Sequence, residues 1–427
     1  MKSKSRFTRR TFLKGAAAAA LPAIVPSSVL AAAGNAAPSN RITLGLIGAG
    51  GRGVSVMKNF MGHDGVHVLG VCDVDKAHLD PVVAAVNRHQ NSSDCKGYAD
   101  FRELTARDDI DAVLIATPDH WHVLQAVDAA RNGKDIYVEK PMAYSLHEGR
   151  VLSDTVAKEK RVLQTGSQQR SDARFRLACE LVRNGRIGRL HTINVGIPAN
   201  NKTCEPTWEP QPVPEGFDYN MWLGPAPWAE YHEQRCHYTF RFILDYSGGQ
   251  VTNFGAHNLD IAQWALDMDN SGPIEISGNG EFPTSGLFTT ATKVHFECLY
   301  ENGVRLTCRT GRFGIYFEGS AGTIYVDRKE IRSVPGDILE KGLGENDTRL
   351  YESNDHVGNF LECMRTREQP ICNAEVGHRS SSICNLGNIA MILGREKLRW
   401  DPEKEEFPDD AEANAMVKPS MREPWTL

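Results

Sequence analysis

Short apolar runs alternate with amphipathic stretches between residues 42 and 164, and the runs have the length of buried strands. Strands are predicted at 42–47, 66–72, around Tyr98, 111–116, 135–138 and 161–164. Helices are predicted from Val54 onward, at 75–89 and at 121–132. Because alternating strands and helices form βαβ units, this pattern predicts an α/β domain with a parallel sheet.

A strand-rich pattern replaces this alternation after a predicted helix at 172–184. Strands are predicted at 191–196, 292–300, 304–310 and 322–327, and Glu301-Asn302-Gly303 has the residues of a hairpin turn. The second half therefore predicts an α+β domain with a mostly antiparallel, open sheet and helices on one face. We place the two domains at 40–165 and 166–427.

An irregular stretch between Pro198 and His237 is rich in Pro, Asn and aromatic residues and is too long for a plain connector. Its aromatic residues include Trp208, Tyr219, Trp222, Trp228 and Tyr231. One interpretation is a lid or subunit-contact loop whose flat rings suit a sugar. The other is a surface excursion held together by its own aromatic side chains.

The first 37 residues have the pattern of a twin-arginine signal peptide. Thr8-Arg9-Arg10-Thr11-Phe12-Leu13-Lys14 precedes an alanine-rich apolar stretch and small residues up to Ala37. This stretch contains two prolines and is short of the ~20 residues that a membrane-spanning helix needs, so no stable membrane insertion is expected. We expect a protein that is periplasmic or otherwise exported by the twin-arginine pathway.

Charge and cysteine usage disfavour two classes of partner. The formal charge is −6, and loss of a signal with six Lys and Arg and no Asp or Glu moves it to about −12. Nucleic acid is not expected as a partner, because it binds basic surfaces. The ten cysteines are scattered singly, with no Cys-x-x-Cys and no Cys and His grouping at zinc-ligand spacing. The sequence therefore predicts no metal site.

A glycine-rich loop, Gly48-Ala49-Gly50-Gly51-Arg52-Gly53, follows the first predicted strand. Gly48 permits a tight turn, Gly50 a close approach to a pyrophosphate, and Gly53 close packing of helix on strand. The second strand ends at Asp73, 20 residues after Gly53, where a Rossmann domain places the carboxylate that binds the ribose 2′-OH. These residues, with Gly51 and Arg52, predict NAD as the cofactor. NADP is disfavoured because Asp73 would repel a 2′-phosphate, although Arg52 is able to approach one.

Two further loops follow predicted strands at the edge where parallel sheets bind ligands. Thr117-Pro118-Asp119-His120-Trp121-His122 follows the strand at 111–116, and Glu139-Lys140-Pro141 follows the strand at 135–138. We predict that these loops line the cofactor crevice through Thr117, Pro118, His120, His122, Glu139 and Lys140.

The ordered set of motifs resembles the family of glucose-fructose oxidoreductase, inositol dehydrogenase and the rhizopine-catabolism protein, known as Gfo/Idh/MocA. The likeness continues through Gly166-Ser167-Gln168-Gln169-Arg170, through 184–189 and through 248–257. The closing run Arg422-Glu423-Pro424-Trp425 is similar to the exported bacterial branch of that family. The resemblance implies a Rossmann domain, an α+β substrate domain and a homo-oligomer, either a dimer or a tetramer.

The resemblance also implies catalytic roles. It puts Lys140 beside the nicotinamide and the substrate hydroxyl, with a cis peptide bond between Lys140 and Pro141. The family's second motif has a carboxylate and, four residues later, a histidine, and these positions are Asn253 and His257 here. His257 is our choice of general acid/base, because imidazole titrates near neutrality. Asn253 is a departure, because an amide can bind or orient a group but cannot ionise.

Two nearby residues are candidate substrate contacts with structural alternatives. Arg170 is predicted either to contact substrate or to form a structural ion pair. Asp260, three residues after His257, is predicted either to act at the site by orienting the imidazole or to cap a helix.

Two enzymatic hypotheses follow for a small carbohydrate substrate. The first is an NAD(P)-dependent oxidoreductase that acts on a hydroxyl of a sugar, polyol or glycoside, with the proton going to His257 or Lys140. The second is an NAD-dependent glycoside hydrolase that uses transient oxidation, elimination and hydride return, and the resembled family includes such enzymes. A non-catalytic sugar sensor is disfavoured because both residues are present. Since soluble NAD is scarce outside the cytoplasm, we expect a tightly bound cofactor.

Overall fold

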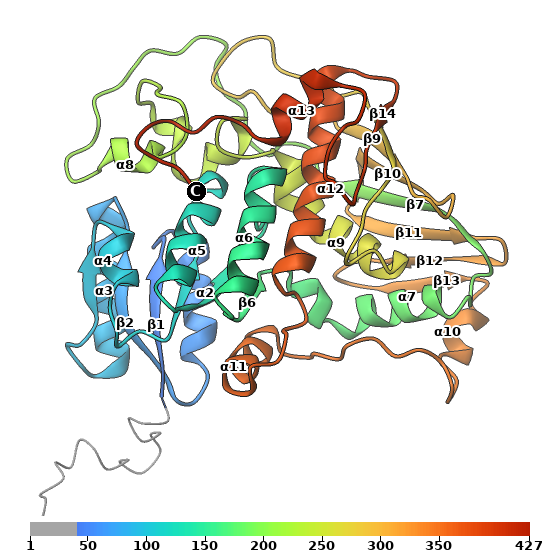
Figure 1. Ribbon diagram of the computed structural model, residues 1–427, viewed down its shortest axis with the longest axis horizontal. Coiled ribbons are helices and arrows are strands. Elements are labelled where there is room, and N and C mark those ends of the chain that lie inside the picture. The colour runs from blue at the N-terminus through green and yellow to red at the C-terminus, as the bar shows by residue number, and fades with distance from the viewer. Residues whose placement is uncertain (1–40) are drawn as a thin grey trace, which may run out of the picture. The chain divides into compact units, whose positions relative to one another are not determined.

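The structure, a computed structural model, describes residues 41–427, in which the strands form two sheets (Figure 1). The predicted signal segment, 1–37, lies outside the described residues. Residues Ile42–Leu427 form one compact unit. None of its described helices is both long and apolar enough to cross a membrane.

The first sheet has six strands in the order β3-β2-β1-β4-β5-β6, and every neighbouring pair is parallel. The strands are β1 (Ile42–Ile47), β2 (Val66–Cys72), β3 (Lys96–Tyr98), β4 (Ala112–Ile115), β5 (Asp135–Val138) and β6 (Leu163–Thr165). The chain reverses its direction of winding between β1 and β4, which is the ligand-binding switch point of a Rossmann sheet. The predicted parallel α/β domain is confirmed.

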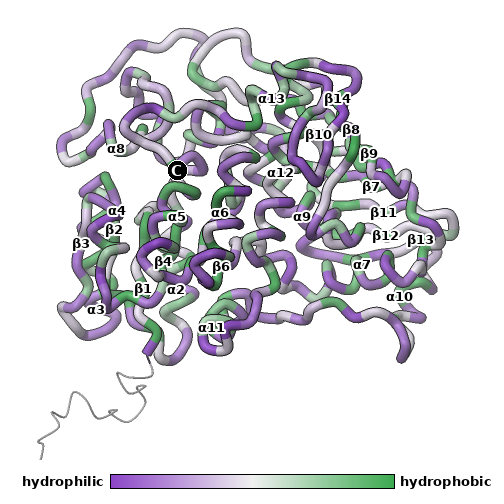
Figure 2. Tube along the Cα trace, viewed as in Figure 1, coloured by the Kyte–Doolittle hydropathy of each residue, from purple (hydrophilic) through white to green (hydrophobic). Residues whose placement is uncertain are grey.

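The helices of this half are α2 (Gly51–Met61), α3 (Lys76–Gln90), α4 (Phe101–Thr105), α5 (His122–Arg131) and α6 (Leu146–Lys158). Figure 2 shows hydrophilic and hydrophobic segments in alternation along α5 and α6, as expected of helices with one buried side. Asp75, Asp100 and Ser145 cap α3, α4 and α6 by accepting backbone N–H groups. By contrast, α2 begins after Gly50 with no side-chain cap, so its first N–H groups are left for a ligand.

The second sheet has eight strands in the order β13-β12-β11-β7-β10-β9-β8-β14. The strands are β7 (Leu190–Ile197), β8 (Glu275–Gly278), β9 (His295–Leu299), β10 (Arg305–Thr310), β11 (Gly314–Gly319), β12 (Gly322–Val326), β13 (Ile331–Val334) and β14 (Leu398–Arg399). Only the pair of β7 and β10 is parallel among these strands, so the predicted mostly antiparallel sheet is confirmed. The predicted turn Glu301-Asn302-Gly303 joins the antiparallel β9 and β10.

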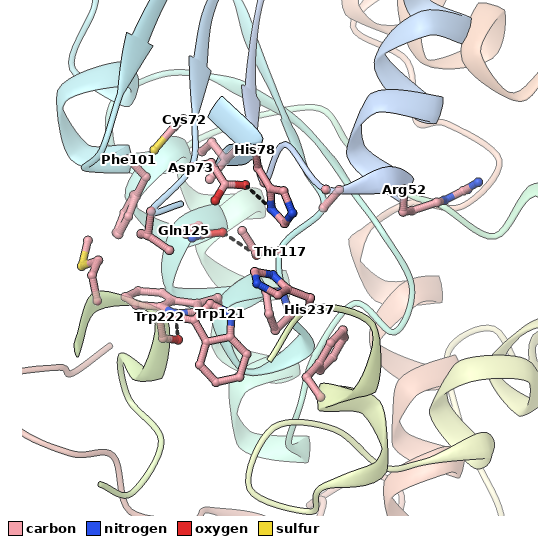
Figure 3. A pocket seen from close by; sticks show the side chains of 18 of the residues that line it. Arg52, Cys72, Asp73, His78, Phe101, Thr117, Trp121, Gln125, Trp222 and His237 are labelled. Carbon is pink, nitrogen blue, oxygen red and sulfur yellow. Dashed lines mark hydrogen bonds and ion pairs between the residues drawn. The ribbon is translucent and has the colours of Figure 1, made fainter. Parts of the chain in front are cut away.

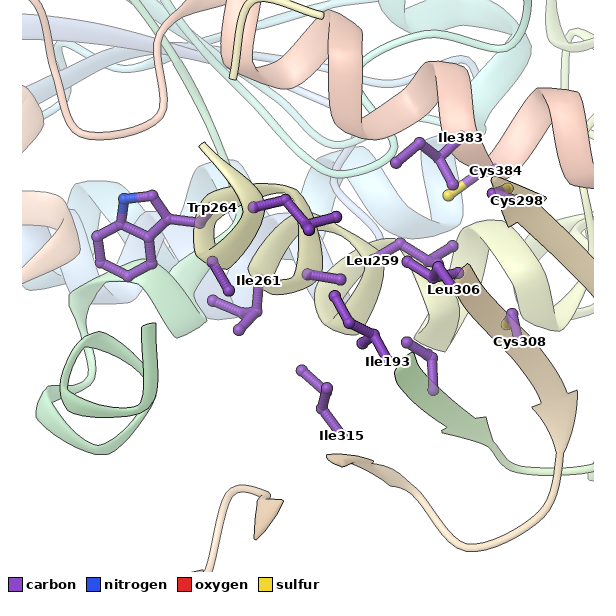
Figure 4. Close-up of a cluster of buried hydrophobic side chains, with 14 of the residues drawn as sticks. Ile193, Leu259, Ile261, Trp264, Cys298, Leu306, Cys308, Ile315, Ile383 and Cys384 are labelled. Atoms are coloured by element: carbon purple, nitrogen blue, oxygen red, sulfur yellow. The ribbon is translucent and has the colours of Figure 1, made fainter. Parts of the chain in front are cut away.

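Helices α7 (Ala173–Arg183), α9 (Ala256–Leu266) and α12 (Ala374–Leu393) contribute with this sheet to one hydrophobic core. Figure 4 shows Leu259 and Ile261 of α9 among side chains of the sheet and of α12. Every residue of α9 is buried. A helix buried all round is held by packing on all sides, so the His257 at its start has a rigid support.

The remaining elements of the described chain are helical, and η marks a 3-10 or π-type turn. They are η2 (Asp119–Trp121), η3 (Gln168–Ser171), α8 (Tyr219–Leu223), η4 (Glu233–Arg235), η5 (His237–Phe242), η6 (Val251–Gly255), α10 (Asp337–Lys341), α11 (His356–Thr366) and α13 (Ala411–Val417).

Candidate active site

The loop between β1 and α2 leaves room for a ligand where the sequence predicts a pyrophosphate. Gly48 has a φ of 95°, and a Cβ there would lie 2.7 Å from the backbone of Ala116. A Cβ on Gly53 would lie 1.9 Å from the Gly48 carbonyl oxygen. A Cβ on Gly50 or Gly51 would meet nothing within 4 Å. Two of the glycines are therefore needed for packing, and the other two border open space at the uncapped start of α2.

This loop borders a cavity of about 600 Å³, shown in Figure 3. Of the predicted cofactor residues, those that line it are Gly48, Gly50, Gly51, Arg52, Asp73, Thr117 and Pro118. The Asp73 carboxylate accepts the backbone N–H groups of Ala49 at 2.7 Å and Asp75 at 2.9 Å, and burial raises the pKa of Asp73. A cavity of this size, with polar groups at one wall, suits a small organic ligand.

The opposite wall comes from the irregular aromatic segment and from η5, which follows it in the chain. Its lining residues are Met221, Trp222, His237, Tyr238, Phe240 and Arg241. The segment also has its own buried cluster, which includes Phe217, Tyr219, Trp222 and Tyr231. Both interpretations of this segment therefore apply in part: it is held together by its aromatic side chains, and it forms a wall of the crevice.

Arg241 is a residue of this wall that the sequence reasoning missed. Its guanidinium lies 4.0 Å from the centre of the Tyr238 ring and donates to the Tyr238 carbonyl. Burial lowers the pKa of Arg241. The negative charge of Asp119 acts in the opposite direction. Arg241 lines the same cavity as the uncapped start of α2, and a cation there favours an anionic ligand such as a diphosphate.

A second cavity of about 730 Å³ brings the three predicted catalytic residues together. Lys140, Asn253 and His257 all line it, and Arg52 lines both cavities. The Lys140 Nζ donates to the Asn253 carbonyl oxygen at 2.6 Å and lies 3.4 Å from the Asn253 Oδ1. The Asn253 amide in turn donates to Gln250 at 3.0 Å. Asn253 thus orients the lysine, although it cannot exchange a proton with it.

Lys140 is held in an environment that favours its neutral form. Burial lowers the pKa of Lys140 to about 8, and the nearby Arg241 and Arg52 lower it as well, whereas Glu139 and Asp119 raise it. The Lys140–Pro141 peptide bond is cis, as predicted. An amine with such a pKa can take and return a proton near neutral pH.

His257 is a buried imidazole that lines the second cavity. Its exposed fraction is 8%, and its Nδ1 has no hydrogen-bond partner among the described residues. Burial lowers the pKa of His257 well below its usual value, and the charge of Lys140 adds to the effect. The ring is therefore neutral at pH 7, and its lowered pKa makes it a weaker base than a free imidazole.

Glu139 connects the two loops rather than facing the nucleotide cavity. Its carboxylate accepts a hydrogen bond from Arg52 at 2.6 Å and one from Gln168 at 3.3 Å. The Glu139 side chain is 5% exposed, whereas that of Arg52 is 49% exposed. This ion pair ties the glycine loop to the Lys140 loop.

His120 and His122 do not line the nucleotide cavity, and both rings bond to backbone carbonyl groups instead. The His120 Nε2 lies 3.2 Å from the Trp222 carbonyl oxygen. The His122 ring lies between the carbonyl oxygens of Pro141 at 2.8 Å and Thr117 at 2.9 Å. Both rings are buried and hold the loops that form the crevice. A position just after a strand does not show whether a side chain lines the cavity or supports the loop from behind it.

Arg170 and Asp260 form a buried ion pair, which corresponds to the structural alternative given for Arg170. Their side chains are 1% and 0% exposed, and the ionic contact is 2.9 Å. Arg170 also pairs with Asp269 at 2.7 Å, and Ser380 donates to Asp260 at 2.6 Å. The pair joins η3 to α9 and α12, and neither residue lines the two cavities.

One group of side chains in the described chain has the donor types of a metal site. Asp75, His78 and His237 bring ligand atoms within 4.8 Å of one another at the edge of the nucleotide cavity. The sequence could not show this group, because His237 comes from a distant segment.

Family models match both halves of the chain. The C-terminal alpha/beta domain of the Gfo/Idh/MocA oxidoreductase family matches residues 200–427, and its NAD-binding Rossmann fold matches residues 42–167.

Curated relatives match over a shorter length. A "Glycosyl hydrolase family 109 protein" of Shewanella baltica (strain OS185) is 30% identical over 201 residues, which cover 43% of this chain and 44% of that protein. A second such protein, from Shewanella sp. (strain ANA-3), is 36% identical over 169 residues, or 35% of this chain and 37% of that protein. The chain thus spans less than half the length of these relatives.

Solved structures share the fold over most of the chain. The WlbA dehydrogenase from Bordetella pertussis, in complex with NADH and UDP-GlcNAcA, has a TM-score of 0.63 and 17% identity, covering 84% of this chain and 99% of that one. An aldose-aldose oxidoreductase from Caulobacter crescentus, complexed with glycerol, gives the same values. With the glycine loop and the paired sheets, the family matches establish that this chain belongs to the Gfo/Idh/MocA oxidoreductase family and has an NAD-binding Rossmann domain.

Proposed function

We propose that the protein is an NAD-dependent oxidoreductase that acts on a hydroxyl group of a small sugar, polyol or glycoside. The observation that carries the proposal is the second cavity, where Lys140, His257 and Asn253 meet next to the glycine-loop cavity. Arg52 borders both spaces, so a ligand in one is adjacent to a ligand in the other.

The residues fit the cofactor that the family model implies. Open space at Gly50 and Gly51, the uncapped start of α2 and the Arg241 cation suit a diphosphate, and Asp73 suits a ribose hydroxyl. NAD, when bound, supplies the acceptor or donor of a hydride.

Proton transfer falls to this chain's own residues. Oxidation of a carbinol carbon requires that its hydroxyl proton be accepted nearby. The His257 ring is neutral, and Lys140 has a pKa of about 8. One of the two accepts the proton, and Asn253 keeps the lysine amine in place through its carbonyl at 2.6 Å.

Hydrolysis of a glycoside is the second candidate, favoured by the relatives named as glycosyl hydrolase family 109 proteins. The same proton-handling pair would serve an enzyme whose substrate is oxidised only transiently. Net redox and hydrolysis then differ in whether the aglycone leaves.

The test is a panel of free sugars, polyols and aryl glycosides added to purified protein. NADH absorbance and aglycone release are followed together, with His257→Ala and Lys140→Ala as inactive comparators. We expect NADH to accumulate for at least one sugar or polyol in the native protein and not in either variant. Aglycone release without lasting NADH would instead establish the hydrolase, and no reaction with the whole panel would contradict both.

The predicted signal peptide supports export of the folded holoenzyme, and cell fractionation tests it. Recovery only from the cytoplasm, with residues 1–37 still attached, would contradict export.

A further inference from the structure

The C-terminal strap, residues 418–427, lies against the nucleotide-binding half of the molecule. Figure 1 traces the chain from α13 across to the start of α5, beside the segment that carries α8. The run Arg422-Glu423-Pro424-Trp425, which is part of the family resemblance, lies in this strap and lines neither of the two cavities.

Arg422 fastens the strap to the aromatic segment. Its guanidinium donates to the Gly224 carbonyl at 2.9 Å, to the Asn220 carbonyl at 2.9 Å and to the Asn220 Oδ1 at 2.8 Å. Its backbone N–H donates to the Pro225 carbonyl at 2.8 Å. The residues between these anchors, Met221 and Trp222, line the nucleotide cavity. Arg422 therefore fixes the backbone on both sides of Met221 and Trp222, which form part of the cavity wall.

Trp425 supports the facing wall. Its ring makes an edge contact with Trp121 at 4.7 Å between centroids and lies 6.4 Å from Phe101, and both of these residues line the nucleotide cavity. The guanidinium of Arg102 lies over the Trp425 ring, 5.4 Å from its centroid. Trp425 itself does not line the cavity, so any effect on a ligand passes through Trp121 and Phe101.

The two walls also meet each other where the strap joins them. The Trp121 indole N–H donates to the Trp222 carbonyl at 2.9 Å. Gly224 has a φ of 50°, and a Cβ there would lie 2.1 Å from the Trp121 ring. Asp73, which suits the adenosine ribose, lines the same cavity as these walls.

We infer that Arg422 and Trp425 are positioning residues that keep the adenosine end of the nucleotide cavity closed, so that the strap retains the dinucleotide. This inference rests on the proposed NAD-dependent function and deepens it. The strap leaves the cavity of Lys140 and His257 untouched, so it acts on cofactor retention and not on the chemical step.

Exchange of bound NAD for isotopically labelled NAD, followed by mass spectrometry, tests the inference on the full-length holoenzyme. In Trp425→Ala we expect exchange to be faster by about 10-fold or more, because an aromatic contact to both wall residues is lost. Trp425→Phe keeps a ring and should restore most of the retention. Thr426→Ala is the matched control, because the Thr426 hydroxyl is exposed and donates only to Leu427.

Steady-state kinetics separate positioning from a general loss of structure. In Trp425→Ala the dissociation constant for NAD should rise by about 10-fold, while kcat of the NAD-saturated protein stays within about twofold of the native value. An equal fall in kcat, or exchange no faster than in Thr426→Ala, would overturn the inference. If circular dichroism shows that Trp425→Ala does not fold, the same measurements are made on Arg422→Gln. This variant loses the three guanidinium hydrogen bonds and keeps the tryptophan. A native protein that binds no NAD would instead overturn the proposed function.

Discussion

Replacing Arg170 by methionine should destabilise the protein strongly without altering its substrate preference. The Arg170 Nε lies 3.0 Å and 2.9 Å from the two carboxylate oxygens of Asp260, whose side chain is fully buried. In the variant, Asp260 keeps only the Ser380 hydroxyl as a side-chain donor. Breaking one partner of a buried pair costs ~3–5 kcal/mol, because an uncompensated charge stays in the interior. This is a large share of the ~5–15 kcal/mol that usually stabilises a protein.

Urea unfolding at pH 7, followed by far-ultraviolet circular dichroism, measures the loss. The double variant Arg170→Met/Asp260→Leu should lose less than the sum of the two single variants, because no buried charge is left unpaired. Arg328→Met is the matched control, because Arg328 is exposed and lines the cavity of Lys140 and His257. A native unfolding midpoint for Arg170→Met, together with a raised KM for substrate, would refute the structural role.

Three further predictions concern the cofactor, the chemistry and acid stability. Asp73→Ala should weaken NAD binding by ~1–3 kcal/mol in calorimetry, since a buried acceptor is lost; unchanged NAD affinity or a native preference for NADP would argue against the assignment. His257→Ala and Lys140→Ala should each lower turnover by at least ~10²-fold, and the double variant should lose less than the product of the two. Normal turnover of His257→Ala would make that residue structural. Arginine and histidine partners lower the pKa of Glu375 and Glu405 from 4.5 to about 2, so these carboxylates stabilise the fold above pH 4.5. That stability should be lost as the pH falls from about 4.5 to about 2, and Glu405→Gln should flatten the pH dependence of unfolding; an identical pH dependence would contradict it.

Local pattern was enough to predict most of the first sheet but not all of the second. The strands at 42–47, 66–72 and 135–138 coincide with β1, β2 and β5, because buried parallel strands are continuous apolar runs. β8 and β13 are short and half-polar, and their place is set by neighbouring strands instead. α12 has no polar face, since it is buried on nearly all sides, and so it shows no helical alternation of apolar and polar residues.

The residues of the candidate site, too, could be predicted only in part from the sequence. The glycine loop, Asp73 and Lys140 could be predicted because they follow strands at the ligand-binding edge. Arg241 and the wall around Trp222 could not, because an irregular segment from the second half folds back onto the first. The correct role of Arg170 depended on Asp269, which lies 99 residues away in the chain. Such a contact leaves no periodic trace in the sequence.

The proposed reaction moves a hydride between a carbohydrate carbon and the NAD bound to this chain, while Lys140 and His257 move the proton. A single-turnover experiment with a sugar deuterated at the reacting carbon tests it most directly. Holoenzyme is mixed with the deuterated form of the first active sugar of the panel. The bound nucleotide is then recovered, and its mass is measured by mass spectrometry. We predict that deuterium appears in the nicotinamide of the native protein and that His257→Ala transfers it at least ~10²-fold more slowly. Product formation with no deuterium ever entering the nucleotide would contradict the claim.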